Sequence, residues 1–261
     1  MNIRTRYLPD DEAERLYAAN PHVGRSYETW CPTCAKTGSY RWRGEDHPCD
    51  CEMQLQLHKW YLASGIGLTY QRLGFDDWAG SAEALEGVSR YLELRDRFLS
   101  RGMGLYVRGP YGTGKTMLAN LVLKQLVRDG HSVWTSTFSQ TVEMFTSGWG
   151  DAVEKSWFQR KFLQSRVLLL DDVGLELRGT SIALAETTFD SILRQRVQSG
   201  RTTLVTTNLH SSEISQGYGG AVLSLLREKS LEQVVEGPDF RPSANDREVN
   251  EVLAGEVRPI T

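Results

Sequence analysis

No apolar run in this sequence approaches the ~20 residues that a membrane-spanning helix needs. Residues 1–15 are rich in charge and hold no apolar stretch of signal-peptide length, so we expect a soluble, cytoplasmic protein without a membrane partner. An excess of one charge is also lacking, because 30 Lys and Arg residues face 33 Asp and Glu residues. The chain as a whole is therefore no basic nucleic-acid coat, although a local basic patch is compatible with this balance.

Cysteine is scarce, and its placement is informative. The four cysteines form a C-x₂-C pair and a C-x-C pair separated by fourteen residues; they are Cys31, Cys34, Cys49 and Cys51. Four thiolates close a tetrahedral structural zinc site, and His47 could replace one ligand because the second pair is tightly spaced. Disulfides and unrelated thiols are the alternatives, and a reducing compartment disfavours the former. We expect residues 1–60 to be a zinc-binding module that contacts a partner.

The rest of the chain lacks internal repeats and low-complexity tracts. Residues 61–80 contain four glycines and are interpreted as a linker, and the polar residues 242–261 as a loosely ordered tail. Residues 81–241 alternate between helical and strand patterns, which predicts a parallel sheet in a three-layer α/β sandwich. The predicted strands are 105–108, 132–136, 166–171, 202–206 and 233–236, and the predicted helices are 82–99, 115–128, 139–146, 151–164, 182–198 and 221–229.

A glycine-rich motif follows the first predicted strand. It fits the pattern G-x-x-x-x-G-K-[ST] and consists of Gly109, Pro110, Tyr111, Gly112, Thr113, Gly114, Lys115 and Thr116. Its glycines let successive backbone N–H groups point at phosphate oxygens, and the following helix begins with free N–H groups. Lys115 is placed to reach the β- and γ-phosphates, and Thr116 to offer its hydroxyl to Mg²⁺. A chance glycine-rich turn is the alternative, but it predicts neither the preceding strand nor the following helix.

Polar side chains end two later strands. Asp171 and Asp172 follow the apolar run 167–170, so they lie at the ligand edge of a parallel sheet. There Asp171 can hold Mg²⁺, and Asp172 can orient or deprotonate an attacking water. An Asp-rich turn is the simpler alternative, which the phosphate loop makes less favoured. Asn208 ends the next strand and either contacts the water or γ-phosphate or caps the following turn.

These motifs resemble the AAA+ ATPases, in the branch that holds the DnaC and DnaI helicase loaders and the IstB transposition ATPases. The resemblance covers about residues 73–241 and rests on GPYGTGKT at 109–116, VLLLDDVG at 167–174, TTN at 206–208 and GPDFR at 237–241. It implies a P-loop NTPase fold of AAA+ type, ATP with Mg²⁺ as ligands, ATP hydrolysis and self-association through the ATPase domains. Zinc-bearing N-terminal modules also occur in some DnaI-like loaders.

By the same resemblance, Asn208 matches sensor 1, and Arg196 matches a basic residue in the helix before the sensor strand. Asp172 stands where many AAA+ proteins carry Glu. The family usually supplies an arginine to the ATP of a neighbouring subunit, but Leu225 stands at the expected position, and Arg227 is the nearest candidate. Two residues along a helix correspond to ~200° of rotation, so Arg227 would face the opposite side. A solvated residue is its alternative role. The C-terminal lid of many AAA+ proteins is not evident.

The resemblance implies a replicative helicase loader that assembles on single-stranded DNA and delivers or regulates a hexameric helicase. An IstB-like regulator of transposition on duplex DNA is the main alternative, and the cysteine module argues against it. A small-molecule kinase would need an acceptor lid that is not evident. A non-hydrolysing ATP-binding adaptor is distinguished by a turnover assay with and without DNA.

Overall fold

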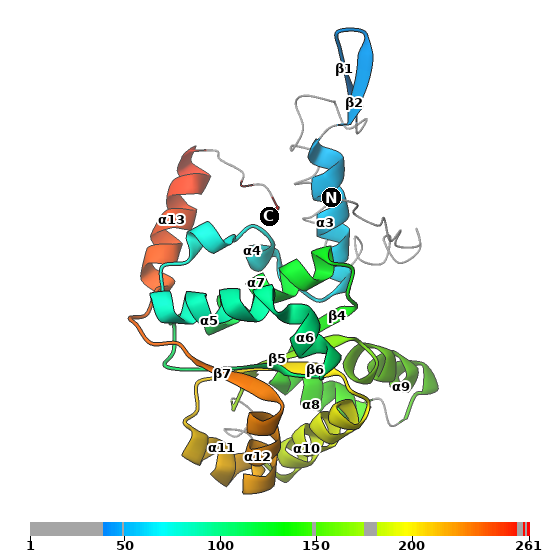
Figure 1. The fold of residues 1–261 in the computed structure, drawn as a ribbon, viewed down its shortest axis with the longest axis vertical. Coiled ribbons are helices and arrows are strands. Elements are labelled where there is room, and N and C mark those ends of the chain that lie inside the picture. The colour runs from blue at the N-terminus through cyan, green and yellow to red at the C-terminus, as the bar shows by residue number, and fades with distance from the viewer. Residues whose placement is uncertain (1–38, 49, 148–149, 175–181, 255–257, 259) are drawn as a thin grey trace.

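A five-stranded parallel sheet organises the chain, with strand order β4-β5-β6-β3-β7. The computed structural model describes residues 39–48, 50–147, 150–174, 182–254, 258 and 260–261 (Figure 1). The sheet strands are β3 (Gly104–Arg108), β4 (Val133–Thr137), β5 (Val167–Val173), β6 (Thr202–Thr207) and β7 (Ser230–Val234). A separate antiparallel hairpin, β1 (Ser39–Trp42) and β2 (Glu45–Pro48), precedes them.

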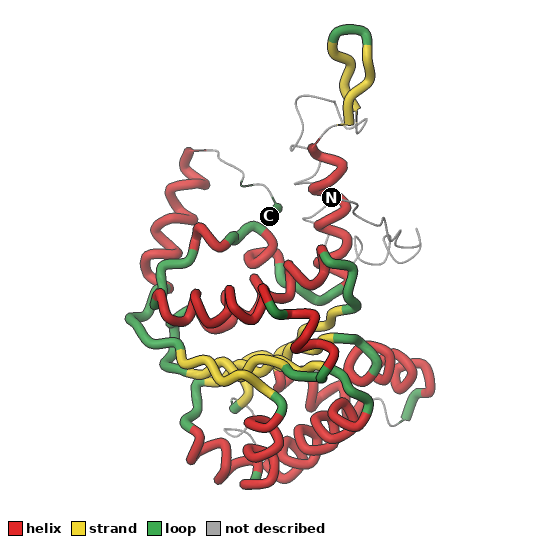
Figure 2. Tube along the Cα trace, viewed as in Figure 1, coloured by secondary structure: helices red, strands yellow, loops and turns green. Residues whose placement is uncertain are grey.

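Helices cover both faces of the sheet, which Figure 2 shows as a yellow layer between red ones. One face carries α3 (Asp50–Ala63), α4 (Leu68–Gln71), the 3₁₀ turn η1 (Phe75–Asp77), α5 (Ala82–Glu93), α6 (Arg95–Ser100) and α7 (Lys115–Arg128). The other carries α8 (Phe138–Ser147), α9 (Ala152–Phe158), the π-helical turn η2 (Gln159–Leu163), α10 (Ile182–Gln198), α11 (Ser211–Tyr218) and α12 (Gly220–Glu228). Helix α13 (Arg241–Ala254) stands beside the first group (Figure 1). The predicted α/β three-layer fold is confirmed.

The side chains of each strand point alternately to the two faces of the sheet, and they build one hydrophobic core on each face. On β5, Val167 and Leu169 join the core under α5 and α7, whereas Leu168 and Leu170 join the core against α8 and α10. All four side chains are fully buried. Because side chains of a strand point alternately to opposite faces, a strand buried on both faces needs a continuous apolar run. The run at 167–170 meets that need and places Asp171 in the last three residues of the strand.

The boundary expected at residue 60 differs from the structure. Helix α3 crosses it, and Tyr61 and Ile66 are fully buried in the core with α7. His58 Nδ1 lies 2.5 Å from Gln71 Oε1, which joins the two sides of the expected boundary. Residues 61–80 thus contribute to the core of the parallel-sheet domain and are not a free linker, since their apolar side chains pack with residues far away in the sequence.

The segment after residue 241, expected to be loosely ordered, also differs. It forms α13, and Ile260 is buried in the core that contains α7. The polar composition of 242–254 reflects a helix with no buried residue among those described, so composition alone could not separate it from a disordered tail.

The cysteine module falls mostly outside the described residues. Cys31, Cys34 and Cys49 lie there, and Cys51 is placed only as part of the first turn of α3. Within the described part of the chain, no group of three or more His, Cys, Asp or Glu side chains could hold a metal ion. The zinc site therefore stays a prediction. Nor does any helix among the described residues combine the length and apolar character needed to cross a bilayer.

Candidate nucleotide-binding site

The phosphate-loop motif lies where β3 ends and α7 begins. Gly112 and Gly114 have φ angles of +73° and +89°, values that residues with a Cβ rarely adopt. At Gly114 a Cβ would lie 2.8 Å from Cζ3 of the Trp78 ring, and at Gly112 it would collide with the Asp239 side chain. The loop thus needs glycine both for its backbone curl and for close neighbours.

Lys115 is buried at the start of α7. Its Nζ donates a hydrogen bond to the Pro110 carbonyl at 2.6 Å, and Thr113 Oγ1 donates to the same oxygen at 3.0 Å. Burial lowers the pKa of Lys115, whereas the charges of Asp172 and Asp171 raise it. A cation enclosed beside these carboxylates is positioned to attract a polyphosphate.

Strand order brings the acidic pair to the phosphate loop. Strand β6 lies between β3 and β5, so the polar end of β6 separates the loop from the acids. Asp171 Oδ1 accepts hydrogen bonds from Thr116 Oγ1 at 3.0 Å and from Thr206 Oγ1 at 2.5 Å. Burial raises the pKa of Asp171 to about 6; the charge of Asp172 adds to the rise, and bonds from the two threonines oppose it. The Thr116–Asp171 contact is the arrangement that a Mg²⁺ site requires.

Asp172 occupies a strained backbone position. Its φ is +55°, uncommon for a residue with a side chain, and the β5–β6 register shifts between Leu170 and Val173. Its N–H donates to Thr206 Oγ1 at 2.9 Å, and Asn208 Nδ2 donates to its Oδ1 at 3.2 Å. Such irregularities re-aim side chains and are frequent next to active sites. The structure therefore brings together Asp172, near the end of β5, and Asn208, just after β6.

Three residues join the site without having been assigned to it from sequence. Burial raises the pKa of Tyr70; the charges of Asp171 and Asp172 raise it further, and a hydrogen bond with Thr116 opposes them. Arg241 lowers the pKa of Lys115, so its charge is felt at the phosphate loop. Trp78 packs on the loop at Gly114. Only Arg241 had a sequence signal, the GPDFR segment; the other two lie in the supposed linker.

Two residues implied by the family resemblance lie elsewhere. Arg227, in the last turn of α12, is half exposed, and its Nε lies 3.9 Å from Glu232 Oε2. Arg196 is fully buried at the opposite edge of the sheet, where it donates hydrogen bonds to the carbonyls of Phe162 (2.7 Å) and Thr202 (2.6 Å). Thr202 begins β6, whereas Thr206 and Asn208 of the site lie at the other end of this strand, so Arg196 is remote from the nucleotide site.

A comparison with known families decides the class of the protein. The model of the IstB-like ATP binding protein family matches residues 93–227, just over half of the chain. The chain belongs to this family. It is an AAA+ protein of the DnaC/IstB branch, and ATP is the nucleotide expected in its site.

Two curated relatives are similar to this chain in sequence. The IstB-like chain is 23% identical to the YdaV protein of Escherichia coli over 173 residues, 65% of this chain and 68% of that one. It is 27% identical over 163 residues to an ATP-binding protein of an insertion sequence in Mycobacterium tuberculosis, covering 57% of this chain and 61% of that protein.

Solved structures share the fold. The DnaC helicase loader aligns with a TM-score of 0.58 at 20% identity, over 65% of the IstB-like chain and all of that chain. DnaI aligns with a TM-score of 0.53 at 17% identity, over 67% and 94%. The replication initiator DnaA, bound to AMPPCP and single-stranded DNA, aligns with a TM-score of 0.52 at 18% identity, over 66% and 52%.

Proposed function

We propose that this IstB-like protein binds ATP with Mg²⁺ and hydrolyses it. The backbone amides of residues 109–116 would hold the phosphates, Lys115 the β- and γ-phosphates, and Thr116 with Asp171 the metal ion. Mg²⁺ supplies charge neutralisation at the phosphates. The observation that carries the proposal is the convergence of the Thr116 and Thr206 hydroxyls on one carboxylate oxygen of Asp171 beside the phosphate loop.

Asp172 and Asn208 are the residues proposed to act on water. Asp172 is aimed by its left-handed backbone and held by the Asn208 amide. A carboxylate in this position can orient a water and accept its proton, and the amide can fix the orientation of the carboxylate. Arg241 completes the set as a cation near Lys115, where it can meet the γ-phosphate.

At the level of the cell, we propose that the protein is a helicase loader that assembles on single-stranded DNA and delivers or regulates a hexameric replicative helicase. The likeness of its fold to the DnaC helicase loader and to DnaI supports this proposal. Bound ATP would act as a switch, because γ-phosphate and Mg²⁺ contacts order a state that hydrolysis abolishes. An IstB-like role in transposition on duplex DNA is the second candidate, supported by the relative from an insertion sequence.

Self-association through the ATPase domains is part of the proposal, with Arg227 as the arginine offered to a neighbouring subunit. Its half-exposed side chain, paired weakly with Glu232 across 3.9 Å, is free to exchange that partner for a phosphate at low cost.

The Asp172→Asn variant tests hydrolysis separately from binding. We expect it to retain ATP binding while its turnover rate falls about 10²–10³-fold, the range for removing one well-placed catalytic group. The measurement is phosphate release by wild type and variant, alone and with single-stranded or duplex DNA, beside nucleotide affinity. Wild-type stimulation by single strands supports the helicase loader; stimulation by duplex alone supports the transposition regulator. ATP binding without any turnover points to an adaptor and contradicts hydrolysis.

We also propose that the N-terminal cysteines hold one structural zinc ion. The module built around this ion would contact the helicase. Purified protein should contain about one zinc per chain, and the Cys31→Ser/Cys34→Ser variant should contain none, because two thiolates cannot complete a tetrahedral site. Metal content by mass spectrometry decides this, with ATP turnover as the second readout. Equal loss of zinc and turnover would contradict separate roles for the two parts.

A further inference from the structure

Lys124 is a lysine enclosed among neutral oxygens. It lies on α7, is 3% exposed, and its Nζ donates to the carbonyls of Leu73 (2.6 Å), Tyr70 (3.1 Å) and Gln71 (3.1 Å). These carbonyls follow from the end of α4, where helical carbonyls lack partners within their own helix. A fourth acceptor, Thr261 Oγ1 at 2.8 Å, comes from the far end of the chain. Burial lowers the pKa of Lys124 to about 7.

Residues at the end of the described chain dock on the same carbonyls. The Thr261 N–H donates to the Gln71 carbonyl at 3.0 Å, and the Thr261 carbonyl accepts from the Tyr61 hydroxyl at 3.0 Å. Ile260 is buried in the core beside them. Burial of the isoleucine side chain removes apolar surface from water, so this docking has an apolar anchor as well as polar contacts.

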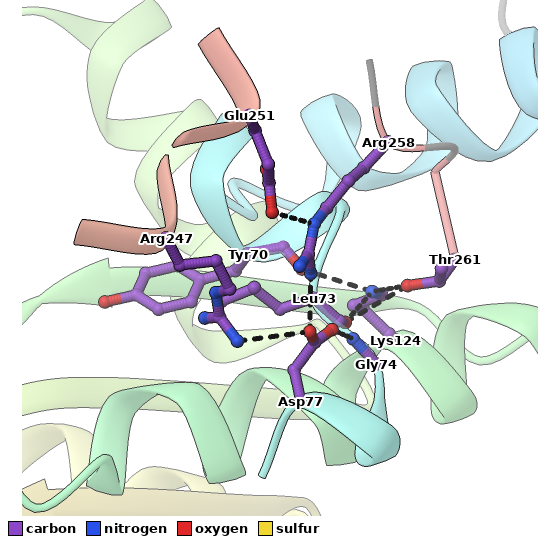
Figure 3. Close-up of polar contacts among 9 residues, drawn as sticks. All are labelled: Tyr70, Leu73, Gly74, Asp77, Lys124, Arg247, Glu251, Arg258 and Thr261. Carbon is purple, nitrogen blue, oxygen red and sulfur yellow. Dashed lines mark hydrogen bonds and ion pairs between the residues drawn. The ribbon is translucent and has the colours of Figure 1, made fainter. Parts of the chain in front are cut away.

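Ion pairs hold the adjoining turn. Arg258 pairs with Asp77 and with Glu251 of α13, and Arg247 Nη1 lies 3.3 Å from the same Asp77 oxygen. The Gly74 N–H also donates to Asp77 at 2.8 Å. Figure 3 shows these side chains converging on Asp77 while Lys124 and Thr261 meet beside Leu73. Single surface pairs contribute little, but a shared acceptor makes a network that fixes this turn.

The residues held in this way also touch the nucleotide site. Tyr70 bonds with Thr116, the proposed Mg²⁺ ligand, and Trp78 packs on the phosphate loop at Gly114. The 70–78 segment therefore lies between the phosphate loop and the residues Arg258, Ile260 and Thr261. Helix α7 begins at the loop and carries Lys124, which contacts both the 70–78 segment and Thr261. The phosphate loop and Thr261 are therefore linked to one another through α7 as well as through the 70–78 segment.

We propose that Arg258, Ile260 and Thr261 form a C-terminal clasp that positions the 70–78 segment over the phosphate loop, with Lys124 as the residue that locks it. The clasp rests on the proposed ATP binding, because its effect is on the affinity for nucleotide. When the clasp opens, Tyr70 and Trp78 lose their positions. The apparent Kd for nucleotide then equals the Kd of the closed state divided by the fraction of molecules that are closed.

Ile260→Asp tests the clasp by placing a charge at a buried position. If about nine in ten molecules open, the Kd for a fluorescent ATP analogue with Mg²⁺ rises about tenfold. Amide hydrogen exchange across residues 70–81 should accelerate in parallel, and kcat at saturating ATP should change much less than KM. Ile260→Val and Val252→Asp are the matched controls; Val252 is 73% exposed on α13, and both should bind as wild type does.

Faster exchange at 70–81 with unchanged affinity would overturn the proposal, as would slow exchange in Ile260→Asp. If that variant does not fold, Arg258→Gln and Lys124→Met replace it with the same expected rise in Kd. Should wild type itself bind no nucleotide, the proposed function fails, and the exchange at 70–81 still decides whether the clasp holds the segment.

Discussion

Lys115→Ala is expected to lower ATP turnover by about 10²–10³ or more, the range for loss of a preorganised charge at a reacting group. The side chain is enclosed, has the acidic pair nearby, and in this structure bonds to the Pro110 carbonyl. A phosphate would be a stronger partner than that carbonyl, because its negative charge adds the attraction of opposite charges to the hydrogen bond.

The loss should come from the site and not from unfolding. Phosphate release and nucleotide affinity are measured together with the thermal midpoint, and Lys229→Ala is the control. Lys229 pairs only loosely with Glu228, at 3.2 Å on the surface, so its removal should leave turnover unchanged. Wild-type turnover by Lys115→Ala would remove the basis for the whole site assignment.

Arg196→Met is expected to lower the free energy of unfolding by about 3 kcal/mol or more, because each buried carbonyl left unpaired costs about 1–3 kcal/mol. The guanidinium donates to the carbonyls of Phe162, Ser165 and Thr202 and to the Thr203 hydroxyl. It thus ties α10 to the starts of β5 and β6. The side chain is fully buried, and this burial lowers its pKa to about 9.

Urea unfolding of Arg196→Met beside Arg194→Met checks this expectation. Arg194 lies on the same helix, is half exposed and pairs with Asp190 one turn away, so its loss should cost no more than about 0.5 kcal/mol. The ATP turnover per folded molecule should be equal in the two variants. A selective loss of turnover in Arg196→Met would instead give Arg196 a role at the nucleotide site.

Local patterns were enough for the centre of the fold. The apolar run 167–170 and the glycine-rich motif predict β5 and the β3–α7 junction, and α7 and α10 have their predicted bounds. The half-exposed edge strand β7, which pairs only with β3, was predicted three residues late at its start. An edge strand buries less of its surface, so its apolar pattern is weaker.

Contacts distant in sequence were not predictable in this way. Tyr61 meets Thr261 across 200 residues and Arg128 across 67, so no local pattern reveals that residues 61–80 belong to the core. Tyr70 and Trp78 enter the site for the same reason. Helix α13 buries no described residue, and its large apolar side chains, Val249, Val252 and Leu253, are confined to its second half and exposed, so they give only a short helical pattern.

Thr206 has one hydroxyl proton, and this limits the states that the acidic pair can adopt. Its proton is committed to Asp171, while its lone pair receives the backbone N–H of Asp172. If a metal ion or a proton at Asp171 turns this hydroxyl, its lone pairs turn with it, and the hydrogen bond from the left-handed peptide at Asp172 must readjust. This single hydroxyl group thus couples the binding of a metal ion or proton at Asp171 to the orientation of Asp172. It does so from β6, the strand that separates both acids from the phosphate loop.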